Sequence, residues 1–222
     1  MTERNGKGMQ ALFLYGVNCT KQIWDRLLPL LPTWHIDIVS YPHAVTEQAT
    51  CVSDLTRWVS ERTKGKRYDV VVGHSLGGLI ALGSAFFSAL DMDTQIVCLD
   101  TNLKPAGAFF RNLMTPEHTK QYGAQIQAMM EQERRHYTPA LMQSIRDGFD
   151  YTDLLLQIKN PVHLLMGDRG RADAEEHIGE LHLSDAALAK LQIRFVPDSC
   201  HLPMIEDPEK LADILNQICR RE

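Results

Sequence analysis

One serine lies inside a glycine-rich segment, Gly73-His74-Ser75-Leu76-Gly77-Gly78, between an apolar run at residues 69–72 and a helical pattern at residues 79–89. A serine on a sharp turn between a strand and a helix projects its hydroxyl above the sheet, and small neighbours let the backbone fold tightly beneath it. The free N–H groups at the start of such a helix can also stabilise a developing oxyanion. The pattern therefore predicts that Ser75 is a nucleophile.

A histidine near the end of the chain has the setting of a general base. The segment Ser199-Cys200-His201-Leu202-Pro203 follows an apolar run at residues 192–196, and Glu206-Asp207-Pro208 opens the last helical pattern. A serine hydroxyl is a weak nucleophile until a base removes its proton, and the pKa of imidazole suits that task near neutrality. We therefore predict that His201 is the base that activates Ser75.

Both residues must be positioned by the surrounding elements. Short apolar runs alternate with helical stretches, and the runs are residues 11–15, 35–39, 69–72, 95–99, 161–166 and 192–196. Uninterrupted apolar strands alternating with helices predict a parallel sheet covered on both faces. Ligands of such sheets bind beyond the carboxyl ends of the strands, which is where Ser75 and His201 lie in the sequence.

Local signals also predict where several helices lie. Helical spacing is found at residues 24–31, 46–62 and 79–89. Ser184 is predicted to cap a short helix, and Asp207 with Pro208 is predicted to begin the last one.

With the serine turn, the histidine loop and this order of elements, the chain resembles the α/β-hydrolase superfamily over nearly its whole length. The resemblance implies one domain over residues 1–222, with a mostly parallel, six-stranded sheet in the order 2-1-3-4-5-6 that lacks the family's first two strands. It also implies a helical cap, residues 101–158, inserted over the active site. In the family, the segment equivalent to Tyr15-Gly16-Val17-Asn18 helps to form the oxyanion hole, so the backbone N–H groups of Val17 and Leu76 are expected to do so here.

The acid that would complete a Ser-His-acid triad is ambiguous. The family most often places it three residues beyond the glycine that follows the fifth strand here, but that position holds Gly170. Three carboxylates remain: Asp168 directly after the fifth strand, Asp100 at the end of the fourth, and Asp173 further along the loop. The acid must reach the second ring nitrogen of His201 and stabilise the imidazolium. We favour Asp168, followed by Asp100.

Composition excludes several classes of protein. The length of 222 residues, with 44% hydrophobic and 23% charged residues, is typical of one globular domain. The net charge of −5, with no basic stripe, argues against a nucleic-acid partner. Residues 1–8 lack the apolar core of a secretory signal, and no apolar run is long enough to cross a bilayer, so no membrane association is expected.

Metal and cofactor sites are not indicated either. The five cysteines are scattered and form no C-x-x-C pair, which argues against a zinc site or a disulfide framework and favours the cytoplasm. No dinucleotide-type glycine loop and no histidine pair at metal-ligand spacing is present, so neither a cofactor nor a metal is expected.

Together these features predict a serine hydrolase that cleaves a small carboxylic ester or thioester through an acyl-enzyme. Related chemistry at a similar site, namely C–C hydrolysis, elimination or haloperoxidation, is an alternative. A non-catalytic binding protein is another, because the usual acid position holds a glycine. Apolar side chains of the predicted cap could line an acyl pocket or simply pack its underside; they are Leu113, Met114, Tyr122, Ile126, Met129 and Met130. The natural substrate and the oligomeric state are not encoded in any pattern that we recognise.

Overall fold

The computed structural model describes residues 8–146 and 148–220 and contains a six-stranded sheet in the order β2-β1-β3-β4-β5-β6. The strands are β1 (Met9–Leu14), β2 (Trp34–Val39), β3 (Val70–His74), β4 (Gln95–Leu99), β5 (Val162–Gly167) and β6 (Leu191–Val196). All neighbouring strands are parallel. The predicted fold class and strand order are therefore confirmed.

Burial explains why the strands have their particular compositions. All residues of β3 and β5 are buried, as expected for strands covered on both faces. The edge strands β2 and β6 contain partly exposed residues, because one side of each strand has no neighbour. The serine turn thus follows a central strand, where the sheet is most rigidly supported.

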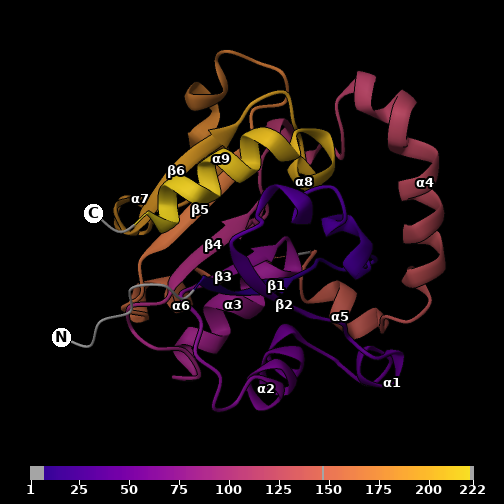
Figure 1. Cartoon of the computed structure of the whole chain (residues 1–222). Helices are drawn as coiled ribbons and strands as arrows, with labels where there is room; N and C mark the ends of the chain where they lie inside the picture. The colour runs from indigo at the N-terminus through magenta and orange to yellow at the C-terminus, as the bar shows by residue number, and fades with distance from the viewer. Residues whose placement is uncertain (1–7, 147, 221–222) are drawn as a thin grey trace.

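Helices cover both faces of the sheet, with α2 and α3 below it and α9 above it in the view of Figure 1. The helices outside the segment between β4 and β5 are α1 (His43–Thr46), α2 (Val52–Arg62), α3 (Leu76–Phe86), α7 (Asp185–Lys190), α8 (Pro203–Glu206) and α9 (Pro208–Cys219), with 3-10 turns η1 (Lys21–Trp24), η2 (Leu28–Leu30) and η4 (Ala174–Leu181). Ser184 accepts a hydrogen bond from the Ala187 amide, and Asp207 accepts one from the Lys210 amide. Both predicted helix caps are confirmed.

Three predicted helices differ from the structure, and the smallest difference is at residues 79–89, where α3 begins and ends three residues earlier. Instead of one helix over residues 46–62, a turn separates α1 from α2, because the Asp54 carboxylate accepts from the amides of Thr50 and Cys51 and so caps a new helix start. Residues 24–31 do not form an α-helix: Trp24 ends the 3-10 turn η1, and residues 28–30 form the separate turn η2. Pro29 has no N–H to continue a regular helical hydrogen-bond pattern there.

The segment between β4 and β5 is helical where it is regular, and comprises η3 (Ala108–Arg111), α4 (Pro116–Arg134), α5 (Pro139–Gln143) and α6 (Thr152–Gln157). Figure 1 shows α4 standing away from the sheet. By contrast, α6 contacts α3 and α7 and so belongs to the layer that covers the sheet. None of the helices in the described ranges is both long and apolar enough to cross a membrane.

Candidate active site

Ser75 occupies the turn between β3 and α3 with φ +52° and ψ −119°. This left-handed backbone is unfavourable for a serine and persists only where its surroundings hold it. The Ser75 amide donates to the Leu99 carbonyl at 2.9 Å, and the Ser75 carbonyl accepts from the Thr101 hydroxyl at 3.1 Å. The end of β4 therefore fixes the conformation of the serine turn.

Two glycines let neighbouring backbones approach this turn. A Cβ atom on Gly77 would collide with the Leu14 carbonyl at the end of β1. A Cβ atom on Gly16 would lie 2.9 Å from the Cβ of Ser75. The first turn of α3 and the loop after β1 thus pack against each other with no space for a side chain.

We expect Gly77→Ala to lower the free energy of unfolding by at least about 1–3 kcal/mol, because the added methyl group meets backbone that cannot rotate away. Urea denaturation followed by circular dichroism measures this. The matched control is Gly179→Ala in η4, where an added Cβ has no neighbour within 4 Å. Equal stability of the two variants would show that the close approach at Gly77 is not required.

His201 lies in the loop after β6, and its neighbours hold its backbone. The buried Glu206 carboxylate accepts from the amides of Cys200 and Leu202, at 2.8 and 3.3 Å. The His201 amide donates to the carbonyl of Leu113, at 3.1 Å. The acidic residue before Asp207-Pro208 therefore positions the histidine loop, which gives the sequence pattern a physical meaning.

A second histidine supports the same loop. The Nε2 atom of the buried His74 lies 2.8 Å from the carbonyl oxygen of His201. Burial lowers the pKa of His74 to about 3, so its ring is neutral near pH 7 and Nε2 must carry the proton that it donates. His74 thus holds the backbone of His201 in place.

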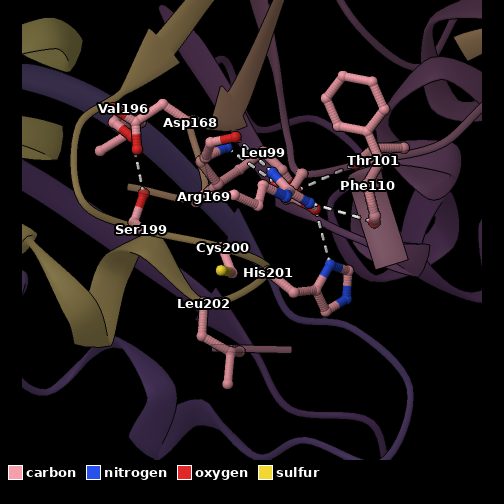
Figure 2. Close-up of polar contacts among 12 residues, drawn as sticks. Leu99, Thr101, Phe110, Asp168, Arg169, Val196, Ser199, Cys200, His201 and Leu202 are labelled. Atoms are coloured by element: carbon pink, nitrogen blue, oxygen red, sulfur yellow. Dashed lines mark hydrogen bonds and ion pairs between the residues drawn. The ribbon is translucent and has the colours of Figure 1, made fainter. Parts of the chain in front are cut away.

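The carboxylate that faces His201 is Asp100. Its Oδ1 atom lies 2.9 Å from His201 Nδ1, and the Asp100 side chain is fully buried. The structure therefore does not place Asp168, the carboxylate that we favoured, against His201. Asp168 accepts a hydrogen bond from the Gly170 amide at 2.8 Å and lies near Val196, away from the histidine ring (Figure 2).

The loop after β5 explains this outcome. The residue of this loop that reaches β4 is Arg169, which has a left-handed backbone with φ +61°. Asp168 remains at the surface turn, and Asp173 pairs with the neighbouring Arg171 at 2.6 Å. Neither carboxylate is therefore available to His201.

Arg169 was not identified from the sequence, yet it makes the most extensive contacts with Asp100. Its Nη1 donates to Asp100 Oδ2 at 2.8 Å and its Nη2 donates to Oδ1 at 3.0 Å, and the Gly167 amide also donates to Oδ2. Its Nη2 bonds the Phe110 carbonyl as well, so the guanidinium joins three segments (Figure 2). The available signal was that Asp100 and Arg169 follow neighbouring parallel strands.

The paired hydrogen bonds from Arg169 to Asp100, which we call the Arg169 clamp, control the charge of Asp100. Burial by itself raises the pKa of Asp100, but the charge of Arg169 and the hydrogen bond from His201 outweigh burial and hold the pKa at about 2. The Arg169 side chain is only 2% exposed, so little solvent screens the pair. Asp100 is therefore ionised at neutral pH despite its full burial.

Ser75, Asp100 and His201 border one cavity of about 950 Å³. Its other lining residues are Leu76, Leu79, Asn102, Pro105, Ala106, Arg111, Ile145, Arg146, Gly148 and Phe149. The six apolar side chains proposed for an acyl pocket do not line it, and Leu113, Met114 and Met130 border a different cavity. Of the two predicted oxyanion donors, Leu76 borders the cavity and Val17 does not.

Within the described residues, the Ser75 hydroxyl makes no hydrogen bond to the His201 ring, whose Nδ1 is engaged by Asp100. Catalytic hydrogen bonds are often long in the free enzyme and tighten when substrate binds. The structured part of the chain also contains no group of three His, Cys, Asp or Glu side chains that could hold a metal ion.

Residues 16–214 match the sequence model of the alpha/beta hydrolase family. No curated protein sequence matches the chain. Similar solved structures include a hydrolase from Oleispira antarctica, with a TM-score of 0.72, 12% identity and coverage of 98% of this chain and 93% of that one.

An enol-lactonase from Burkholderia xenovorans LB400 has a TM-score of 0.68 at 13% identity, with 97% of this chain and 92% of that chain covered. A thermophilic esterase from Thermogutta terrifontis has a TM-score of 0.65 at 18% identity, with 96% and 90% covered. At such identities the likeness establishes the fold alone.

Proposed function

Because the chain belongs to the alpha/beta hydrolase family, we propose that it is a serine hydrolase that cleaves a small carboxylic ester or thioester. Ser75 is the nucleophile, His201 the general base and Asp100 the acid of the triad. The observation that carries the proposal is the 2.9 Å contact between a buried, ionised Asp100 and His201 Nδ1, at the cavity that Ser75 borders.

The proposed reaction proceeds in two stages. The Ser75 oxygen attacks the carbonyl carbon while His201 Nε2 takes the hydroxyl proton, and His201 then returns this proton to the departing alcohol or thiol. A water molecule, deprotonated by His201, next attacks the acyl-serine and releases the acid. The backbone N–H groups of Val17 and Leu76 would hold the oxyanion in both stages, each contributing about 3 kcal/mol to lowering the barrier.

Asp100 supplies what this mechanism requires of its acid. As an ionised acceptor it keeps the proton of neutral His201 on Nδ1, which leaves Nε2 free to accept from Ser75. It also stabilises the imidazolium that forms during attack. The alternative of a non-catalytic binding protein rested on the glycine at the usual acid position, and a carboxylate at this site removes that reason.

We further propose that residues 101–158 act as a cap on the single domain, residues 1–222. Support comes from the walls of the cavity, because Pro105, Arg111, Ile145 and Phe149 all belong to this segment. The Leu113 carbonyl also accepts the His201 amide, so the segment contacts the proposed base directly. A small molecule enclosed between cap and sheet is the partner that this arrangement suits.

A fluorophosphonate probe tests the proposal, because it phosphonylates a serine only where a base has activated it. We expect folded wild-type protein to be labelled at Ser75, as located by peptide mass spectrometry, and Ser75→Ala to lose both labelling and ester hydrolysis. Ser53→Ala on α2, which does not line the cavity, is the matched control and should label normally. Folded wild-type protein that remains unlabelled would contradict the proposal.

A further inference from the structure

Two arginines, Arg111 and Arg146, line the cavity beside Ser75, and both residues are exposed to solvent. Among the described residues neither lies within ion-pair distance of a carboxylate. The Nε and Nη2 atoms of Arg111 both donate to the Ala106 carbonyl, at 2.9 and 2.8 Å. Because that acceptor is neutral, the charge of Arg111 remains uncompensated and its Nη1 donors remain available to a ligand.

The acidic group on the cavity wall does not offset these cations. Asp100 is the one carboxylate among the described lining residues, and Arg169 and His201 already occupy both of its oxygens. The whole chain carries a net charge of −5. A local excess of positive charge at the cavity therefore stands out against a protein that otherwise repels anions.

The remaining walls complete a mixed surface. Leu79, Ile145 and Phe149 provide apolar contacts, whereas the buried Oδ1 atom of Asn102 has no hydrogen-bond partner in the described part of the chain. That oxygen is a buried acceptor, and an anionic ester has no donor to give it, so the polar anchors for such a ligand are the two arginines. The cavity thus offers an apolar wall and separate polar anchors.

We infer that this site takes anionic esters or thioesters, in which a short carbon chain joins the scissile carbonyl to a carboxylate or similar group. Arginine binds carboxylates through charge-assisted N–H donors, and Arg111 and Arg146 are the arginines that line the cavity. The inference rests on the proposed hydrolase function and names its class of substrate. Arg111 and Arg146 are specificity residues that act on substrate binding.

The test compares two esters of equal length, p-nitrophenyl hexanoate and mono-p-nitrophenyl adipate, which differ only in a terminal methyl or carboxylate group. We expect wild-type protein to prefer the adipate ester by about tenfold or more in kcat/KM, mainly through a lower KM. Arg111→Gln and Arg146→Gln should each lower this preference by about tenfold. Arg57→Gln on α2 removes the same charge away from the cavity and should leave the preference unchanged.

The outcomes separate the inference from the function on which it rests. Hydrolysis of both esters without preference for adipate, or a preference that neither cavity variant changes, overturns the inference and leaves the hydrolase intact. The protein could also label with fluorophosphonate and hydrolyse neither ester. In that case the rate of labelling is measured with and without free adipate. The inference requires adipate to slow labelling of Ser75 in wild type and not in Arg111→Gln, and any other result overturns it. Protein that does not label at all overturns the proposed function together with the inference.

Discussion

Replacing Asp100 with asparagine should lower kcat for ester hydrolysis by about 10³- to 10⁴-fold, the size of effect seen when a triad acid loses its charge. Asparagine keeps the shape of the side chain but neither fixes the required tautomer of His201 nor stabilises the imidazolium. Steady-state kinetics with a p-nitrophenyl ester measure the loss. Circular dichroism must accompany them, because the substitution also leaves the buried Arg169 without its counter-charge.

Asp168→Asn is the matched control for that experiment. Asp168 follows β5 and Asp100 follows the neighbouring strand β4, but Asp168 accepts a hydrogen bond from the Gly170 amide and does not contact His201. We expect its kcat to stay within about threefold of wild type, since the triad geometry is untouched. A thousandfold loss in Asp168→Asn, or full activity in Asp100→Asn, would refute the assignment of Asp100 as the acid.

Removing the clamp on Asp100 should have the largest effect on stability. Arg169→Met is expected to lower the free energy of unfolding by about 3–5 kcal/mol, because a buried carboxylate loses its partner.

The pH dependence of stability gives this prediction a definite sign. Asp100 has a folded-state pKa of about 2, below its ordinary value of 3.8, so its stabilising contribution is present above pH 3.8 and is lost as the pH falls toward 2. In Arg169→Met the pKa of Asp100 rises, and this contribution shrinks. Urea titrations at several pH values measure both effects.

Arg171→Met is the control for Arg169→Met. Arg171 lies two residues further along the same loop, but it is exposed and pairs with Asp173. Exposed ion pairs contribute little, so the free energy of unfolding and its pH dependence should stay close to those of wild type. Equal behaviour of the two arginine variants would mean that the clamp on Asp100 has no special role.

The fold could be predicted from the sequence because its signals are local. Apolar runs such as residues 69–72 and 95–99 are buried on both faces, and parallel strands joined by helices allow few arrangements. Helix caps such as Ser184 and Asp207 were recognised for the same reason, since each acts within a few residues. Where a local signal was weaker, at residues 46–62, the predicted helix was too long.

The positions of Ser75 and His201 were predictable for a related reason. Ser75 directly follows β3 and His201 lies in the loop after β6, so the topology brings both to the carboxyl edge, and both border one cavity in the structure.

Which carboxylate meets His201 is a different kind of question, and the sequence by itself left it open. Asp100 and Asp168 both follow strands at the same edge, so strand order does not distinguish them. The choice depends on side-chain direction in two loops with left-handed residues, and on Arg169 filling the space between them. Sequence patterns indicate which residues share an edge of the sheet. The path of a loop and the pairing of buried charges depend instead on contacts between distant segments, and only the folded chain brings these segments together.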